Sequence, residues 1–268
     1  MQPPGPFSLE KTAGIAWLTL NRPEKHNAMD ADFFELLRQH FRQLDDDGDV
    51  KVVVIKAAGE SFSAGTDLAS AAKMVGGGAA DERQKLHRKI LDLQAAVSAV
   101  EQCCKPVIAA IHGYCIGGAV DLICACDIRI AESAALFSIR EARMGIIADL
   151  GTLQRLPRIV GEGRARELAF SGRDFSATEA CAMGLVSRVC EGRQSLHDAA
   201  ETLARQIADN PPLTVMGVKD VLNYSRDHGV EAGLRYVAQK NAALLLSEDL
   251  AEAFSAFREK RKPQFKGK

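Results

Sequence analysis

The sequence predicts an α/β fold built on a mainly parallel sheet. Over about the first 160 residues, short apolar segments typical of buried strands alternate with longer segments whose apolar residues recur at helical spacing. Such alternation favours parallel strands joined by right-handed crossovers. Helical patterns fill most of the remaining chain, so we expect a core domain over residues 1–200 and a helical region over residues 201–268. The composition, 47% hydrophobic and 26% charged, is ordinary for a globular protein.

The first strand, helix and second strand follow from local patterns. Ile15–Leu20 is predicted as a strand that ends before Pro23, which cannot donate a hydrogen bond to a neighbouring strand. Asp30 can cap a helix, and Val52–Ile55 is a continuous apolar strand of the kind that is buried on both faces. The apolar residues of the helix between them fall at helical spacing: Phe33, Leu37, Phe41 and Leu44.

The alternation continues in the next part of the chain. Gly76–Gly78 indicates a flexible stretch, which precedes a predicted helix over Glu82–Gln102. A strand is predicted over Pro106–Ile111, a short apolar helix over Ala119–Cys124 and a further strand over Asp127–Ala131.

The last third of the chain is mainly helical. Ser176 and Glu179 have the spacing of a capping box, and Val186–Val189 is one short strand. Pro211 and Pro212 open a helix, and Ser247 can cap the last one. This last helix packs either against a neighbouring subunit or back onto its own domain. Its apolar stripe consists of Leu250, Phe254 and Phe257.

Charge and apolar length exclude two classes of partner. The chain carries 34 basic and 35 acidic side chains, a formal net charge of −1, so no global field attracts it to nucleic acid or to an anionic membrane. Apolar stretches such as Pro106–Ile111 are far shorter than the roughly 20 residues of a membrane-spanning helix. We therefore expect neither nucleic-acid binding nor membrane insertion.

The seven cysteines occupy uneven positions that do not suggest a disulfide framework. A reducing, intracellular compartment fits this pattern better. The spacing of Cys124 and Cys126 is too short for a usual zinc pair, and no cluster of cysteine or histidine follows, so we expect no metal site.

Two loops rich in small residues follow predicted buried strands, at Ser61–Asp67 and His112–Ala119. Glycine lacks the side chain that keeps peptide N–H groups away from a ligand. At a helix start such as Gly117–Gly118, the N–H groups are free and lie at the positive end of the helix dipole. Two such donors would form an oxyanion hole, in which one donor typically contributes about 3–4 kcal/mol. The alternative is that both loops are only tight strand-to-helix turns.

Three acids follow these loops in apolar surroundings. Asp121 lies one turn into the glycine-headed helix, and Glu141 and Asp149 come later, the second of them between isoleucine, alanine and leucine. Carboxyl groups that share an apolar site have their pKa values pushed apart, which yields one acid and one base. The alternative for each is a structural role, with Arg140 or Arg143 as the ion-pair partner of Glu141.

Six segments, in order along the chain, resemble the enoyl-CoA hydratase/isomerase (crotonase) superfamily. The resemblance covers Ile15 to about residue 260. It implies a spiral of ββα units with a helical carboxyl-terminal trimerisation region, assembled as a homotrimer or as a homohexamer of two trimers. The segments are Leu20–Ala28, Phe62–Leu68, Lys105–Gly113, Gly117–Leu122, Cys126–Arg129 and Gly151–Pro157.

The resemblance also assigns a substrate and a binding site. It implies an acyl-CoA thioester whose carbonyl oxygen accepts from the N–H groups of Ala64 and Gly118. Coenzyme A is part of the substrate, and no other cofactor is expected. The residues expected to contact substrate or its CoA moiety are Lys25, His26, Ala28, Ala64, Gly65, Thr66, Asp67, Leu68 and Gly118.

Within the superfamily, the acids Asp121, Glu141 and Asp149 look most like those of the isomerases that convert 3,5-dienoyl-CoA to 2,4-dienoyl-CoA in fatty acid β-oxidation. That likeness implies that Glu141 removes a proton from C2, Asp121 delivers one to C6 and Asp149 tunes or orients the pair, although the first two roles could be exchanged. Ala119 departs from the family's third glycine and crowds the helix start.

Two alternatives remain open at this point. One is a 2-enoyl-CoA hydratase, in which Glu141 and Asp121 would position and split water. The other is a non-catalytic protein with the same fold that serves as a binding or scaffold subunit. The resemblance implies a mitochondrial or peroxisomal location, but neither end of the sequence carries a recognisable address, so the cytosol is the alternative.

Overall fold

The computed structural model describes residues 5–70 and 78–268. Its centre is a six-stranded sheet in the order β1-β2-β3-β4-β6-β9. Strand β1 is antiparallel to β2, and every later neighbouring pair in this sheet is parallel, so the predicted α/β class is confirmed. The strands are β1 (Phe7–Thr12), β2 (Ile15–Leu20), β3 (Val52–Ala57), β4 (Val107–Ile111), β6 (Ile128–Glu132) and β9 (Arg188–Cys190).

A second, three-stranded sheet has the order β5-β7-β8. Strands β5 and β7 are parallel, and β7 and β8 are antiparallel. Each of these strands has three residues, too few to show a periodic pattern, so their positions are not predictable from sequence. The strands are β5 (Tyr114–Ile116), β7 (Leu136–Ser138) and β8 (Asp174–Ser176).

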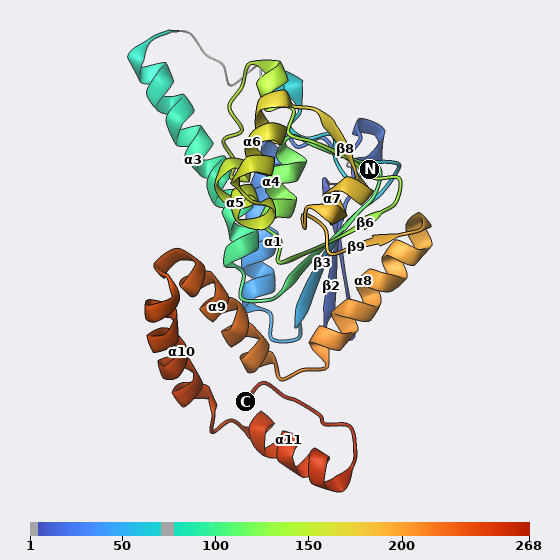
Figure 1. Ribbon diagram of the computed structural model, residues 1–268, viewed down its shortest axis with the longest axis vertical. Helices are drawn as coiled ribbons and strands as arrows, with labels where there is room; N and C mark the ends of the chain where they lie inside the picture. Colours follow the sequence, from blue (N-terminus) through green and yellow to red (C-terminus); the bar gives the residue numbers. More distant parts are fainter. Residues whose placement is uncertain (1–4, 71–77) are drawn as a thin grey trace.

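Helices cover both faces of the large sheet, and the alternation of side chains along β3 separates two cores. Val53 and Ile55 pack with the buried residues of α1 and α3, whereas Val52 and Val54 pack with those of α8 (Figure 1). This burial on both faces explains the continuous apolar run of the strand. The helices of this part are α1 (Ala31–Asp46), α3 (Ala80–Gln102), α4 (Gly118–Cys124), α5 (Thr152–Val160), α6 (Glu162–Ser171), α7 (Ala177–Ala182) and α8 (Gly192–Ala208), with short 3-10 helices η1 (Pro23–Lys25) and η2 (Glu141–Met144).

Local signals predicted several helix ends correctly. The Asp30 side chain accepts from the N–H of Phe33 at 3.0 Å, and Ser247 caps the last helix in the same way. Ser176 also acts as a cap, but Glu179 does not complete the predicted capping box, because its carboxylate pairs with Arg173. The predicted flexible stretch at Gly76–Gly78 lies largely outside the described residues.

Three final helices extend away from the sheet (Figure 1): α9 (Pro212–His228), α10 (Val230–Leu244) and α11 (Glu248–Glu259). The predicted domain boundary after residue 200 falls inside α8. Because Leu196, Ala200 and Ala204 of α8 are buried against the large sheet, this helix belongs to the core, and the helices that leave the core begin at Pro212. The predicted strand Val186–Val189 also begins two residues later, at Arg188.

Candidate active site

Two segments far apart in sequence run side by side at the edge of the site. The N–H of Ala64 donates to the carbonyl of His26, the N–H of Met29 donates to that of Gly65, and the N–H of Asp67 donates to that of Met29, each at 2.9 Å. The buried Asn27 holds the first segment in place, since its amide donates to the carbonyls of two residues in the 58–61 stretch at 2.9 and 2.8 Å. The structure therefore unites the two segments that the resemblance assigned to CoA.

The glycine-headed start of α4 packs directly against this pair. A Cβ atom on Gly118 would lie 2.9 Å from Oγ1 and 3.5 Å from the amide nitrogen of Thr66. A Cβ atom on Gly65, whose φ is +87°, would lie 2.4 Å from the carbonyl oxygen of Ile116 and 3.2 Å from the amide nitrogen of Gly118. Only glycine permits this contact, because any side chain at position 65 would drive the two loops apart.

Two peptide N–H groups at this junction are free. Within residues 5–70 and 78–268, no hydrogen bond uses the N–H of Thr66 or that of Gly118, the first residue of α4. The prediction that Ala64 supplies the first donor needs correction, because the N–H of Ala64 is already bonded to the carbonyl of His26. Thr66, named from sequence only as a residue near CoA, has the free N–H beside Gly118.

Asp121 is a buried acid with one strong partner. Its side chain is 1% exposed and accepts from the N–H of Thr152, at the start of α5, at 2.6 Å. Burial raises the pKa of Asp121 to about 7; the Thr152 hydrogen bonds oppose this rise, and the nearby charges of Glu141 and Asp149 add to it. The carboxyl group is thus partly protonated at neutral pH.

Glu141 approaches the same glycines from η2. A Cβ atom on Gly117 would lie 3.2 Å from Oε1 of Glu141, and its buried Oε2 has no hydrogen-bond partner among the described residues. Burial, and to a smaller extent the charge of Asp149, raise the pKa of Glu141. The ion pairs suggested as an alternative are not formed, because Arg140 pairs with Asp174 and Arg143 donates to the carbonyl of Ser171.

Asp149, the third acid, is bonded through its backbone to α3. Asp149 is half-buried, and this burial raises the pKa of its carboxyl group. Its carbonyl accepts from the amide of Gln94 at 2.7 Å. The structure therefore brings the three acids near one another, since Glu141 and Asp149 both raise the pKa of Asp121 and Asp149 also raises that of Glu141.

The other residues predicted to contact CoA, here called the CoA rim, range from exposed to buried. Lys25, His26, Ala64 and Leu68 are exposed, whereas Ala28 and Asp67 are half-buried and Gly65 is buried. Asp67 has a structural task as well, because its carboxylate accepts from the N–H of Ser70 at 2.9 Å, which lowers its pKa.

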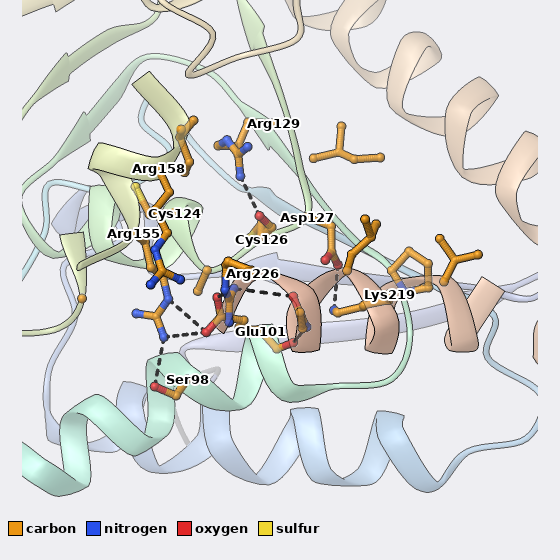
Figure 2. A pocket seen from close by; sticks show the side chains of 18 of the residues that line it. Ser98, Glu101, Cys124, Cys126, Asp127, Arg129, Arg155, Arg158, Lys219 and Arg226 are labelled. Carbon is orange, nitrogen blue, oxygen red and sulfur yellow. Dashed lines mark hydrogen bonds and ion pairs between the residues drawn. The ribbon is translucent and has the colours of Figure 1, made fainter. Parts of the chain in front are cut away.

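A cavity of about 310 Å³ is lined in part by Thr66. Its walls include the apolar side chains of Met29, Phe34 and Leu93. A larger cavity of about 1170 Å³ lies among α3, α5 and α9 (Figure 2), and Asp149, Leu150 and Gly151 are part of its lining. The chemistry described above belongs to the side with the free peptide groups, since the ionisable side chains of the larger cavity are mainly paired with one another.

A family model for enoyl-CoA hydratase/isomerase matches residues 10–268. The chain belongs to the enoyl-CoA hydratase/isomerase family. This confirms the resemblance inferred from the six segments.

Two relatives and one solved structure refine this membership. The chain is 49% identical over 258 residues to a protein of Arabidopsis thaliana named Delta(3,5)-Delta(2,4)-dienoyl-CoA isomerase, peroxisomal, a match that covers 94% of this chain and 93% of that one. A protein of Mus musculus named Delta(3,5)-Delta(2,4)-dienoyl-CoA isomerase, mitochondrial, is 43% identical over 252 residues, covering 92% and 77%. The crystal structure of enoyl-CoA hydratase from Bacillus anthracis aligns with a TM-score of 0.90 at 33% identity and covers 98% and 100%. The predicted crotonase fold is thereby confirmed.

Across the described part of this family member, no helix has the length and apolar character needed to cross a membrane.

Proposed function

We propose that this protein is a dienoyl-CoA isomerase, which moves the double bonds of a 3,5-dienoyl-CoA to the 2,4 positions in fatty acid β-oxidation. The observation that carries the proposal is the set of three acids, Asp121, Glu141 and Asp149, beside two free peptide N–H groups. The names of the relatives from Arabidopsis thaliana and Mus musculus support the same reaction.

The two peptide donors activate the substrate. The N–H groups of Thr66 and Gly118 donate to the thioester oxygen and stabilise the negative charge that develops there when a proton leaves C2. Because Gly118 begins α4, its N–H lies at the positive end of the helix. Both donors belong to a junction of packed backbone, so little reorganisation is needed as the charge forms.

Glu141 acts as the base and Asp121 as the acid. Glu141 takes the C2 proton, and the electron pair of the broken C–H bond delocalises onto the thioester oxygen and, through the 3,5-diene, as far as C6. Asp121 then donates its proton to C6, so that the double bonds lie at C2–C3 and C4–C5. The elevated pKa of Asp121, about 7, favours this role because a useful fraction of the carboxyl group carries a proton at neutral pH. The two acids regain their starting states by exchange with solvent.

Asp149 tunes the pair. Its negative charge raises the pKa of both Asp121 and Glu141, as expected for carboxyl groups that share an apolar site. The reaction transfers protons only, so the proposal requires no metal and no redox cofactor. Coenzyme A enters and leaves as part of the substrate, along the rim formed by Lys25, His26 and Ala28.

We also propose that the protein assembles as a homotrimer or homohexamer through α9–α11. These helices extend from the core and expose large apolar side chains that water disfavours, which supports contact with a second copy. Light scattering on the purified protein tests this, and a monomer would contradict it. The exposed side chains include Leu222, Leu234, Phe254 and Phe257, which are 65%, 64%, 68% and 85% exposed.

For the location we propose a reducing compartment, the mitochondrion or the peroxisome, as the names of the two relatives support. The cytosol is the alternative.

A direct assay separates the isomerase from its alternatives. Purified protein is given a 3,5-dienoyl-CoA, and the absorbance of the conjugated 2,4-dienoyl-CoA is followed; in parallel, it is given crotonyl-CoA, and loss of the enoyl absorbance is followed. We expect the first reaction to be much faster. Faster hydration of crotonyl-CoA would make the protein a hydratase, and wild-type turnover no better than that of Asp121→Asn on every acyl-CoA would indicate a scaffold subunit.

A further inference from the structure

One face of α3 makes polar contacts with the segment that leads into α5. Gln94, Ser98 and Glu101 are spaced four and three residues apart and therefore lie on one side of the helix. Gln94 donates to the carbonyl of Asp149, and the other two residues accept from Arg155 of α5. Helix α3 thus contacts the segment Asp149–Thr152 directly through Gln94 and indirectly through Arg155. It contributes none of the three acids of the site.

Most of these contacts are hydrogen bonds from Arg155. Its guanidinium donates to Glu101 at 3.0 and 3.2 Å and to Ser98 at 3.1 Å, as Figure 2 shows, and it also reaches the carbonyl of Leu150 at 3.5 Å. The ion pair is largely enclosed, with 15% of the arginine side chain and 18% of the glutamate side chain exposed. Glu101 is further fixed by Arg226 of α9.

The guanidinium also supports the backbone turn at Gly151. This residue has a φ of +127°, and a Cβ atom there would lie 1.8 Å from Nη1 of Arg155. The guanidinium therefore occupies the space in which any side chain at position 151 would lie. The glycine and the arginine together define how the chain turns from Leu150 into α5.

This turn carries two groups of the proposed mechanism. Asp149 lies just before Gly151, and Thr152 lies just after it. The N–H of Thr152 donates to the buried carboxylate of Asp121. A shift of the turn would move both groups at once. Misplacement of a reacting group by about 1 Å is enough to reduce a rate about 100-fold.

We propose that Arg155 is a positioning residue, which holds the Asp149–Thr152 turn on α3 and so places Asp149 and the Thr152 N–H beside Asp121. The inference rests on the proposed function for its effect on rate, but its structural content stands apart from that function. Lysine does not replace this arginine fully, because an ammonium group lacks the planar set of donors that reaches Glu101, Ser98 and a carbonyl together.

The test compares Arg155→Ala with Arg158→Ala. Arg158 is the matched control, because it belongs to the same helix, lines the same cavity and pairs with Asp227, but has no contact with the turn. We expect Arg155→Ala to lower kcat about 10- to 100-fold while KM for the dienoyl-CoA changes less than about 3-fold, since the CoA rim lies elsewhere. Arg158→Ala should retain both values.

A chemical rescue and a second variant separate loss of positioning from loss of folding. Because Arg155 lines the large cavity, added guanidinium ion at concentrations that leave the wild type folded should restore part of the kcat of Arg155→Ala. If Arg155→Ala does not fold, Arg155→Lys serves instead, and we expect it to keep the fold with a kcat below that of wild type and of Arg158→Ala; a kcat equal to that of wild type would count against the positioning role.

Hydrogen exchange at the Thr152 amide gives a readout that needs no substrate. Exchange should accelerate in the Arg155 variant and not in Arg158→Ala. Unchanged exchange, or a kcat equal to that of the control, would overturn the positioning role. An inactive wild type with accelerated exchange in the variant would instead reject the proposed reaction and keep the structural inference.

Discussion

Helix α4 and the segment from Glu141 to Asp149 bring acids to the same glycine turn, but they are built in opposite ways. All seven residues of α4 are buried, and Asp121 is held by a backbone N–H. In η2 no residue is fully buried, Glu141 has an oxygen without a partner among the described residues, and Ile147 farther along is 76% exposed. The packed helix provides a fixed acid with a raised pKa, whereas the surface segment provides an acid that is free to meet a substrate.

The largest effect that tests this contrast is expected for Glu141→Gln. If Glu141 is the base, its amide cannot accept the C2 proton, and kcat should fall about 1000-fold or more. Stability should change little, since Oε2 of Glu141 has no hydrogen-bond partner to lose in the described structure. Steady-state assay with a 3,5-dienoyl-CoA measures the first effect and thermal unfolding the second. Glu162→Gln, an exposed change on α6, is the control, and a kcat near wild type for Glu141→Gln would remove this residue from the mechanism.

A somewhat smaller loss, about 100-fold in kcat, is expected for Asp121→Asn. The asparagine oxygen can still accept from Thr152, so the local geometry should persist without a proton to donate. In the wild type, kcat should decline as the pH rises through about 7, because Asp121 must be protonated to act as the acid. The variant should lack that alkaline decline. A profile of kcat against pH checks this, and an identical decline in both proteins would assign it to another group.

The smallest effect concerns stability. The pKa of Asp121 is about 7 in the folded protein and 3.8 as its ordinary value, so the folded state binds the proton more tightly. The contribution of Asp121 to the free energy of unfolding is therefore fully present below about pH 4. It is lost as the pH rises through about 7. Between pH 5 and pH 8 the wild type should lose roughly 2–3 kcal/mol of unfolding free energy from this source.

Urea unfolding at both pH values measures this loss, with Asp121→Asn as the comparison. The variant should be less sensitive to pH than the wild type by about that amount. Equal sensitivity would mean that Asp121 is not the buried titrating acid, and the contrast between the two regions would lose its basis.

Much of this arrangement was predictable from local patterns. The strands Ile15–Leu20 and Val52–Ile55, the helix capped by Asp30 and the glycine-headed helix before Cys124 all have strong apolar periodicity or clear end signals. The short strands β5, β7 and β8 were not predictable, because three residues carry too little pattern. Strand β1 was also missed, since its half-exposed sequence lacks a continuous apolar run.

Some residues of the candidate site were likewise predictable from sequence, and others were not. Its glycines and acids were identified from residue type, apolar surroundings and order along the chain. The roles of Thr152 and Gln94 had no signal in sequence, because each depends on one hydrogen bond to a residue that is 31 or 55 positions away.

The amino-acid order alone therefore determined the fold class, the family and the set of acids, since those depend on patterns that neighbouring residues carry. Only the tertiary structure decided which peptide N–H is free, Thr66 rather than Ala64, and that Arg140 and Arg143 turn to partners other than Glu141. The physical reason is that a donor or a charge can be satisfied by any group that folding brings near it, and residue type does not disclose which group that will be.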